Sequence, residues 1–239
     1  MTKQAFSPNS VINTYIATED SLCAFLGNVP YCPEHKDVWS PILVTILLES
    51  CSQLDSLWQY ESRKSPYVTK RRLSINDYFG YYGEYLGDKW LIFYGETAEI
   101  IKPYSMWSQA SQYIPQQYPK HELGWWKAYN KLKHNRFINR SEAKLQFAIN
   151  ALAGLFLVIL RSESCRNAIA QAGWMFGDGH NVQAHLGEDS PSDKDKFITA
   201  ESKLFTYTVG WGKEILLPGR IDWQGTCSLR FRHWIDQYS

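Results

Sequence analysis

The 239-residue chain has few cysteines, and none of them is spaced for a familiar metal or redox site. The five cysteines are odd in number, lie far apart and include no Cys-x-x-Cys pair. This pattern excludes a zinc knuckle and a thioredoxin-like motif. Scattered, unpaired cysteines are typical of reducing compartments, so we expect a cytoplasmic protein.

The chain also lacks an excess of charge and a membrane-spanning run. Its 25 Lys and Arg stand against 24 Asp and Glu, so affinity for nucleic acid requires a local patch rather than bulk charge. The N-terminal residues show no export signal. The longest apolar stretch, 145–160, contains Gln146 and Asn150 and is shorter than the ~20 residues that cross a bilayer. We therefore expect a buried core helix there and no contact with membranes.

Motifs for cofactors and metals are weak as well. The glycines between residues 173 and 179 lie in no strand-to-helix context, which excludes a phosphate loop. Asp178, His180 and His185 match no standard ligand spacing. We expect neither a metal nor a cofactor.

Helical patterns dominate the first 172 residues. Ser40 and Pro41 form a typical helix start, and apolar residues then recur at helical spacing to Ser62. Aromatic residues make up 15% of the chain, which predicts bulky core layers. The expected helices cover 20–26, 41–62, 74–85, 123–137 and 141–172, with a helical turn at 107–113.

Shorter β-type runs punctuate this pattern. The runs 90–94 and 99–102 predict a hairpin inserted between helices. From Gly173 onward the composition becomes rich in glycine and polar residues, and further β-type runs follow at 204–209 and 214–217. The sequence therefore predicts a mainly α protein with two units. These are a helical bundle over residues 1–172 and a small β-rich appendage over residues 173–239.

Residues 62–72 form a polar, basic segment that we expect on the surface. Its arginines and lysines are either a phosphate contact or simply a solvated run of charge.

The stretch from Gly124 to Arg136 places polar and cationic side chains at helical spacing. Asn130 and His134 are four residues apart and so share one helix face, flanked by Lys127 and Lys133. Histidine exchanges a proton near neutral pH, an amide orients it or binds a sugar hydroxyl, and cations neutralise phosphate. This combination suits metal-independent cleavage of RNA. In the alternative, the amide and the imidazole form hydrogen bonds inside the bundle or stabilise a dimer.

Two further expectations concern the surroundings of this helix. Trp126 and Phe137 are expected to be exposed, and an exposed aromatic patch predicts a symmetric homodimer. Glu49, on the helix at 41–62, is either solvated or faces Asn130 and His134 across the bundle, where it would raise the pKa of the histidine.

The order of elements and the residues Tyr129–Asn130 and Lys133–His134, with Arg136, resemble the HEPN family of bacterial helical proteins. The resemblance covers approximately residues 20–170. It implies an antiparallel helical bundle that dimerises. It also implies metal-independent ribonuclease activity in toxin–antitoxin systems, stress responses or phage defence.

In that family an arginine and a polar residue precede the catalytic histidine. Here the positions separated from His134 by four, five and six residues hold Tyr129, Ala128 and Lys127, none of which is arginine. Asn130 matches the polar position, and Lys127 supplies a positive charge. The resemblance thus implies His134 and Asn130 as catalytic residues. The substrate-binding residues that we expect are Lys127, Tyr129, Lys133 and Arg136.

The alternative function is a non-catalytic, dimeric interaction module of the same fold. The partners expected for the two readings are RNA, a second copy of the chain, and a cognate antitoxin or regulatory protein.

Overall fold

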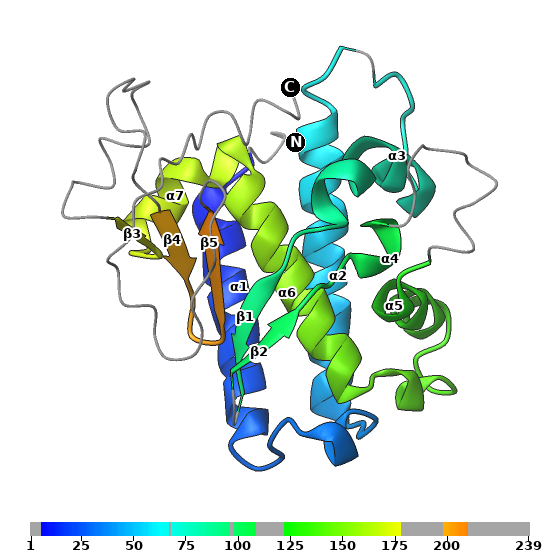
Figure 1. Cartoon of the computed structure of the whole chain (residues 1–239). Coiled ribbons are helices and arrows are strands. Elements are labelled where there is room, and N and C mark those ends of the chain that lie inside the picture. Colours follow the sequence, from blue (N-terminus) through cyan, green and yellow to red (C-terminus); the bar gives the residue numbers. More distant parts are fainter. Residues whose placement is uncertain (1–5, 67, 96–97, 109–121, 178–197, 210–239) are drawn as a thin grey trace.

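The computed structural model describes residues 6–66, 68–95, 98–108, 122–177 and 198–209, and this part of the chain is mainly helical (Figure 1). The predicted mainly α class is therefore confirmed. The helices are α1 (Pro8–Leu26), α2 (Pro41–Ser62), α3 (Ile75–Leu86), α4 (Ser105–Ser108), α5 (Gly124–His134), α6 (Leu145–Arg161) and α7 (Arg166–Gln171). The strands are β1 (Leu91–Tyr94), β2 (Ala98–Ile101), β3 (Met175–Gly177), β4 (Ile198–Glu201) and β5 (Phe205–Val209). Short 3₁₀ turns cover Pro33–His35, Arg140–Glu142 and Glu163–Cys165.

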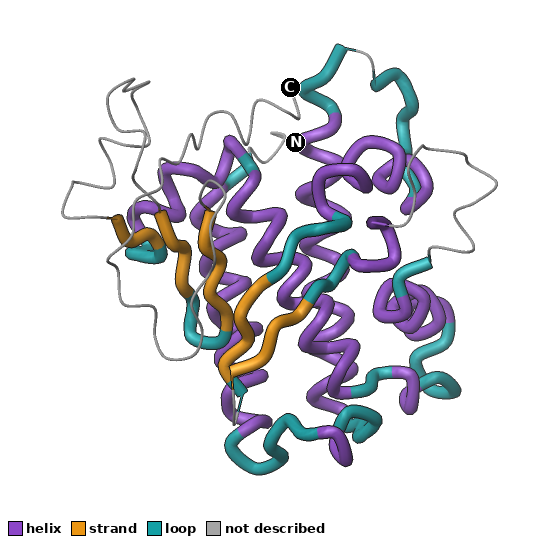
Figure 2. The backbone as a smooth tube through the Cα atoms, in the orientation of Figure 1, coloured by secondary structure: helices purple, strands orange, loops and turns teal. Residues whose placement is uncertain are grey.

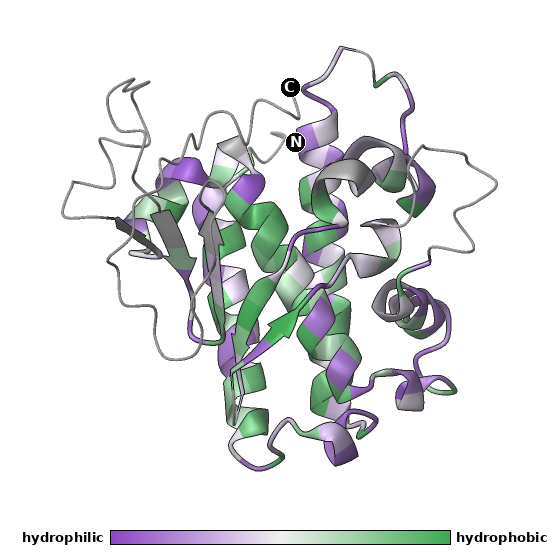
Figure 3. Cartoon of the chain, in the orientation of Figure 1, coloured by the Kyte–Doolittle hydropathy of each residue, from purple (hydrophilic) through white to green (hydrophobic). Residues whose placement is uncertain are grey.

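Helices α2 and α6 form the centre of the molecule. Residues 151–160 of α6 are all buried, and α6 packs against α1, α2, α5 and α7. A helix that is apolar on every side has to be covered on every side, so the predicted central helix is confirmed. Figure 3 shows hydrophobic residues along α6 and along β1.

The first helix begins earlier than predicted. It covers Pro8–Leu26 rather than 20–26, and Ser7 caps it by accepting a hydrogen bond from a backbone N–H of the first turn. Pro8 occupies the first helical position, where its missing N–H costs nothing. This is the same Ser-Pro signal that begins α2 after Ser40.

The single helix predicted over 141–172 is wrong, because the structure interrupts it. Helix α6 begins at Leu145 and ends at Arg161, and α7 follows only after a 3₁₀ turn. Ser162 has an extended backbone, with ψ of 116°, and its hydroxyl donates a hydrogen bond to the carboxylate of Glu61 on α2. A serine that bonds outside the helix competes with the helical hydrogen-bond ladder and favours such a break.

One antiparallel sheet joins the hairpin to the C-terminal strands, in the order β2-β1-β5-β4-β3. Strand β1 pairs with β5 through Ile92 opposite Thr206 and Phe93 opposite Phe205. The predicted hairpin is confirmed in its place, but it forms one side of a five-stranded sheet rather than a two-stranded insertion. Figure 2 shows the strands in front of α1 and α6, and β5 contacts α6. The sheet thus crosses the boundary predicted at residue 173.

A buried carboxylate fastens the turn between β4 and β5 to α1. Glu19 Oε1 accepts hydrogen bonds from Ser202 Oγ at 2.5 Å, from the Leu204 N–H at 3.0 Å and from the Tyr15 hydroxyl at 3.1 Å. Its Oε2 accepts one from the Lys203 N–H at 3.2 Å. Burial raises the pKa of Glu19, although these hydrogen bonds act in the opposite direction. We call these five residues the Glu19 clamp.

An aromatic cluster fixes α5 against α2. Its centre is Trp58, whose ring centroid lies within 6.0 Å of those of Tyr78, Tyr82, Tyr104, Trp107 and Trp126. The Tyr104 hydroxyl donates to the carbonyl of Gly154 at 3.0 Å. A Cβ at position 154 would lie 2.9 Å from that hydroxyl oxygen, so the close approach of the ring to α6 requires glycine.

Within the described ranges, no helix is both long enough and apolar enough to cross a bilayer. The predicted helices at 41–62 and 74–85 and the strand at 204–209 are confirmed as α2, α3 and β5. The β-type run expected at 214–217 lies outside the described residues, as do Asp178, His180 and His185.

Candidate functional site

Helix α5 ends at His134 rather than at Phe137, so part of the predicted site lies beyond the helix. Asn135 leaves the helical conformation, with φ of −150° and ψ of 81°, and its Oδ1 accepts a hydrogen bond from the Ile138 N–H at 3.3 Å. Asn139 Nδ2 donates to the Lys131 carbonyl at 2.9 Å, which satisfies one of the last carbonyls of the helix. Two asparagines thus end α5 and turn the chain back toward α6.

The inner face of α5 is aromatic. The side chain of Trp126 is only 5% exposed and packs on Trp58, so the prediction that Trp126 lies on the surface is wrong. Tyr129 is 4% exposed, and burial raises the pKa of its hydroxyl, partly offset by Lys133. The Tyr129 ring therefore supports the site from within, since its buried face cannot stack on a base.

The outer face carries Asn130, which is half-buried, and His134, which is exposed. Neither side chain makes a hydrogen bond to another residue of the described structure, which disfavours the internal hydrogen-bonding role considered above. Glu49 accepts a hydrogen bond from Gln53 on its own helix at 3.2 Å. No hydrogen bond or ion pair joins Glu49 to His134 in the part of the chain that the structure describes.

The cations of this region fall into two groups. Lys127 lies 3.6 Å from a carboxylate oxygen of Glu122, and Lys131 lies 2.6 Å from one of Glu142, so both have acidic partners. Lys133 and Arg136 are exposed, and neither has an acidic partner among the described residues. Lys133 Nζ lies 5.2 Å from the centroid of the Tyr129 ring, a cation–π contact that orients the ammonium without neutralising it.

The turn after α5 exposes two large apolar side chains directly after Arg136. Phe137 is 80% exposed, as predicted, and Ile138 is 78% exposed. The guanidinium carbon of Arg140 lies 5.5 Å from the centroid of the Phe137 ring. We call residues 133–140 the α5 tip. Sequence reasoning missed Ile138 and Arg140 because it expected helix α5 to continue to Phe137, which left these two residues as a short connection with no signal of their own.

In the described structure, the α5 tip combines an imidazole without a hydrogen bond to another residue, cations without an acidic partner and an exposed aromatic ring. Cations attract phosphate groups, and an exposed ring offers a stacking surface for an unpaired base. Among the residues with described positions, no group of His, Cys, Asp and Glu side chains is arranged to hold a metal ion. The imidazole of His134 offers proton transfer, and the cations beside it offer anion binding.

Comparison of the chain with protein-family models, with curated proteins and with solved structures found no match.

Proposed function

We propose that the α5 tip binds RNA and that His134 acts as a general acid or base in its metal-independent cleavage. The observation that carries this proposal is the exposure of His134 beside Lys133 and Arg136, whose charges no carboxylate of the described structure balances. A local group of exposed cations creates a positive potential that attracts phosphate groups.

In the proposed reaction, the 2′-hydroxyl of a ribose attacks the adjacent phosphorus. The imidazole of His134 accepts the hydroxyl proton as the new P–O bond forms. The bond from phosphorus to the 5′-oxygen then breaks, and the departing oxygen takes up a proton from the imidazolium or from water. Lys133 and Arg136 neutralise the phosphate. Asn130, one turn before His134 and without a hydrogen bond to the imidazole, orients the ribose.

The resemblance of Tyr129–Arg136 to the HEPN motif supports the same function. We accordingly propose an antiparallel HEPN-like bundle that acts in the cytoplasm in bacterial stress or phage defence. A cognate antitoxin or regulatory protein would then control it. Lys127 is paired with Glu122, so in this proposal its contact with substrate requires that ion pair to open. Exposed pairs of this kind contribute only ~0–1 kcal/mol, which makes such an exchange inexpensive.

One observation favours a second function. Phe137 and Ile138 form an exposed apolar surface, and such surfaces often mark protein interfaces. In this alternative the chain is a non-catalytic module that forms a homodimer through the α5 tip. Sedimentation at micromolar concentration tests this alternative: Ile138→Ser should turn a dimer into a monomer, whereas a monomeric wild-type chain would exclude it.

The cleavage proposal is tested with purified full-length protein, a single-stranded RNA and EDTA in the buffer. His134→Ala should slow cleavage by ~100-fold or more, the usual effect of losing a general acid or base, with little change in RNA affinity. Because His134 is exposed, its replacement should change the unfolding free energy by less than ~0.5 kcal/mol, which circular dichroism verifies. Expression of the wild-type chain should slow bacterial growth, and His134→Ala should relieve this. RNA left intact by the wild-type protein would remove the catalytic part of the proposal.

A further inference from the structure

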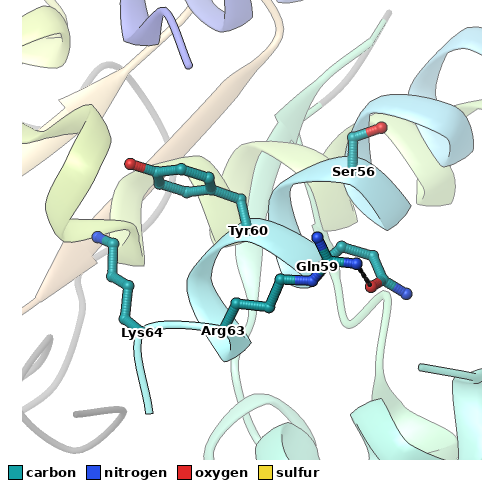
Figure 4. A pocket seen from close by; sticks show the side chains of 5 residues that line it. All are labelled: Ser56, Gln59, Tyr60, Arg63 and Lys64. Carbon is teal, nitrogen blue, oxygen red and sulfur yellow. Dashed lines mark hydrogen bonds between the residues drawn. The ribbon is translucent and has the colours of Figure 1, made fainter. Parts of the chain in front are cut away.

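The C-terminal end of α2 carries a shallow pocket of about 370 Å³ (Figure 4). All the side chains that line it carry hydrogen-bond donors and none is acidic. They belong to Ser56, Gln59, Tyr60, Arg63 and Lys64, which follow one another at helical spacing on one face of α2 and just beyond its end.

The guanidinium in this pocket is held in place by its neighbours. Arg63 Nη2 donates to Gln59 Oε1 at 3.4 Å and to the Arg71 carbonyl at 3.0 Å. Gln59 is itself fixed, because its Nε2 donates to the Leu73 carbonyl at 3.2 Å. The Nε–H and Nη1–H groups of Arg63 are not used by these bonds. A pre-positioned guanidinium suits the bidentate recognition of phosphate, since little side-chain entropy is lost on binding.

The charge around the pocket is positive. Lys64 is paired with Glu61 at 2.8 Å, and Lys70 is paired with Asp77 at 2.7 Å. Three exposed arginines have no carboxylate partner in the described part of the chain: Arg63, Arg71 and Arg72. The hydrogen bond from Arg63 to the Arg71 carbonyl brings these residues to the same end of α2.

The aromatic ring in the pocket is already covered. Phe6 stacks on Tyr60 with ring centroids 3.8 Å apart and planes inclined by 12°. Lys64 Nζ lies 5.2 Å from the centroid of the same ring. Phe6 and Lys64 thus already occupy stacking positions on this ring, which leaves less of it for a base. The donors and cations of the lining, none of which is acidic, favour an anionic ligand.

We propose that this pocket binds the phosphate group of a ligand, with Arg63 as its principal contact and Gln59 as the residue that positions Arg63. The inference does not depend on the function proposed for the α5 tip, because it uses different residues, at the C-terminal end of α2. The phosphate group belongs either to a small phosphomonoester or to the backbone of an RNA.

The test is an NMR titration of the full-length, ¹⁵N-labelled protein with inorganic phosphate at constant ionic strength. The side-chain signals of Arg63 and Gln59 should shift and saturate. Arg63→Gln should weaken binding by tenfold or more, in keeping with the loss of a charge-assisted hydrogen bond. Arg72→Gln removes the same charge outside the pocket and should change affinity by no more than about twofold.

A second pair of variants guards against a general loss of charge or fold. Ser56→Asp places a carboxylate in the pocket and should abolish saturable binding, whereas Ser52→Asp, one turn earlier on α2 and exposed, should preserve it. Competition then identifies the source of the phosphate. Displacement by glycerol phosphate but not by single-stranded RNA indicates a small ligand, and displacement by RNA indicates its backbone. Shifts that do not saturate, or equal losses in Arg63→Gln and Arg72→Gln, would show only a solvated run of charge and overturn the proposal.

Discussion

The Glu19 clamp and the α5 tip are both polar regions, but they differ in burial and in partners. The carboxyl group of the clamp is buried and has partners within the protein, whereas the cations of the α5 tip are exposed and have no acidic partner in the described structure. Glu19 is 1% exposed, and every hydrogen bond that it accepts comes from within the protein. His134, Lys133 and Arg136 are exposed and have no acidic partner in the described structure. A buried carboxylate without partners would cost several kcal/mol, so its satisfaction is a requirement of folding. Exposed cations carry no such cost and are available to a partner.

We expect the largest effect on stability from removing the three clamp residues that follow β4, namely Ser202, Lys203 and Leu204. A chain of residues 1–172 loses β3–β5 and leaves Glu19 without Ser202, Lys203 and Leu204. We expect it to lose cooperative thermal unfolding by circular dichroism, in contrast to a chain that ends at residue 209 and keeps all five strands. Equal melting of the two chains would show that residues 1–172 are an independent unit, as the sequence alone predicts.

A single substitution within the clamp should have the next largest effect. Glu19→Ala removes the acceptor of the buried Ser202 hydroxyl and of the buried Leu204 N–H, and it also removes one partner of the Tyr15 hydroxyl. We expect a loss of ~3 kcal/mol in the free energy of unfolding. The matched control is Glu49→Ala on α2, which removes only a half-exposed hydrogen bond and should cost less than ~1 kcal/mol. Chemical denaturation measures both. A similar cost for the two variants would contradict the structural role assigned to the clamp.

The clamp should also make stability depend on pH. Burial raises the pKa of Glu19 above its usual 4.5 in the folded protein. The folded state therefore binds this proton more tightly than the unfolded state does, so the contribution is fully present below pH 4.5 and is lost as pH rises through the folded pKa. The slope cannot exceed ~1.4 kcal/mol per pH unit for one group. Glu19→Gln should remove it, and a variant with the wild-type profile would refute the direction of this pKa shift.

The smallest effect on stability is expected at the α5 tip. Phe137 is 80% exposed, so Phe137→Ser should change the free energy of unfolding by less than ~0.5 kcal/mol. If an RNA base stacks on this ring, the same variant should weaken RNA binding by ~1–3 kcal/mol. Fluorescence anisotropy with a labelled single-stranded RNA measures the second effect. An unchanged affinity would leave the ring without a role in RNA binding and favour the dimer interface.

The sequence predicts features that depend on local patterns and misses features that depend on contacts between distant residues. Helix α2 was predictable because Ser40–Pro41 and its apolar spacing are local signals. Helix α1 carries the same start at Ser7–Pro8, but its buried positions include Thr18 and Glu19, which interrupt the apolar pattern. Glu19 can be buried only because Ser202, 183 positions along the chain, folds onto it. Contacts over that separation leave no local signature.

The same reasoning applies to the candidate site. Helical spacing predicts that Asn130 and His134 lie on one face of a helix. Both residues lie within α5, four positions apart, as predicted. The end of α5 at His134 depends on hydrogen bonds between two asparagine side chains and the backbone. The residue types alone do not predict that these hydrogen bonds form. The burial of Trp126 depends on Trp58, which comes from another helix and is far away in sequence.

The most direct test of the RNA-binding claim is the salt dependence of RNA affinity. Each phosphate contact releases about one counterion, so Lys133→Ala and Arg136→Ala should each lower the slope of log affinity against log salt by about 0.7 for single-stranded RNA. Lys102→Ala removes an exposed cation far from the α5 tip in the sequence and should leave the slope unchanged. Equal slopes for the wild-type protein, Lys133→Ala and Arg136→Ala would contradict the account, because the exposed cations of the α5 tip would then contact no phosphate.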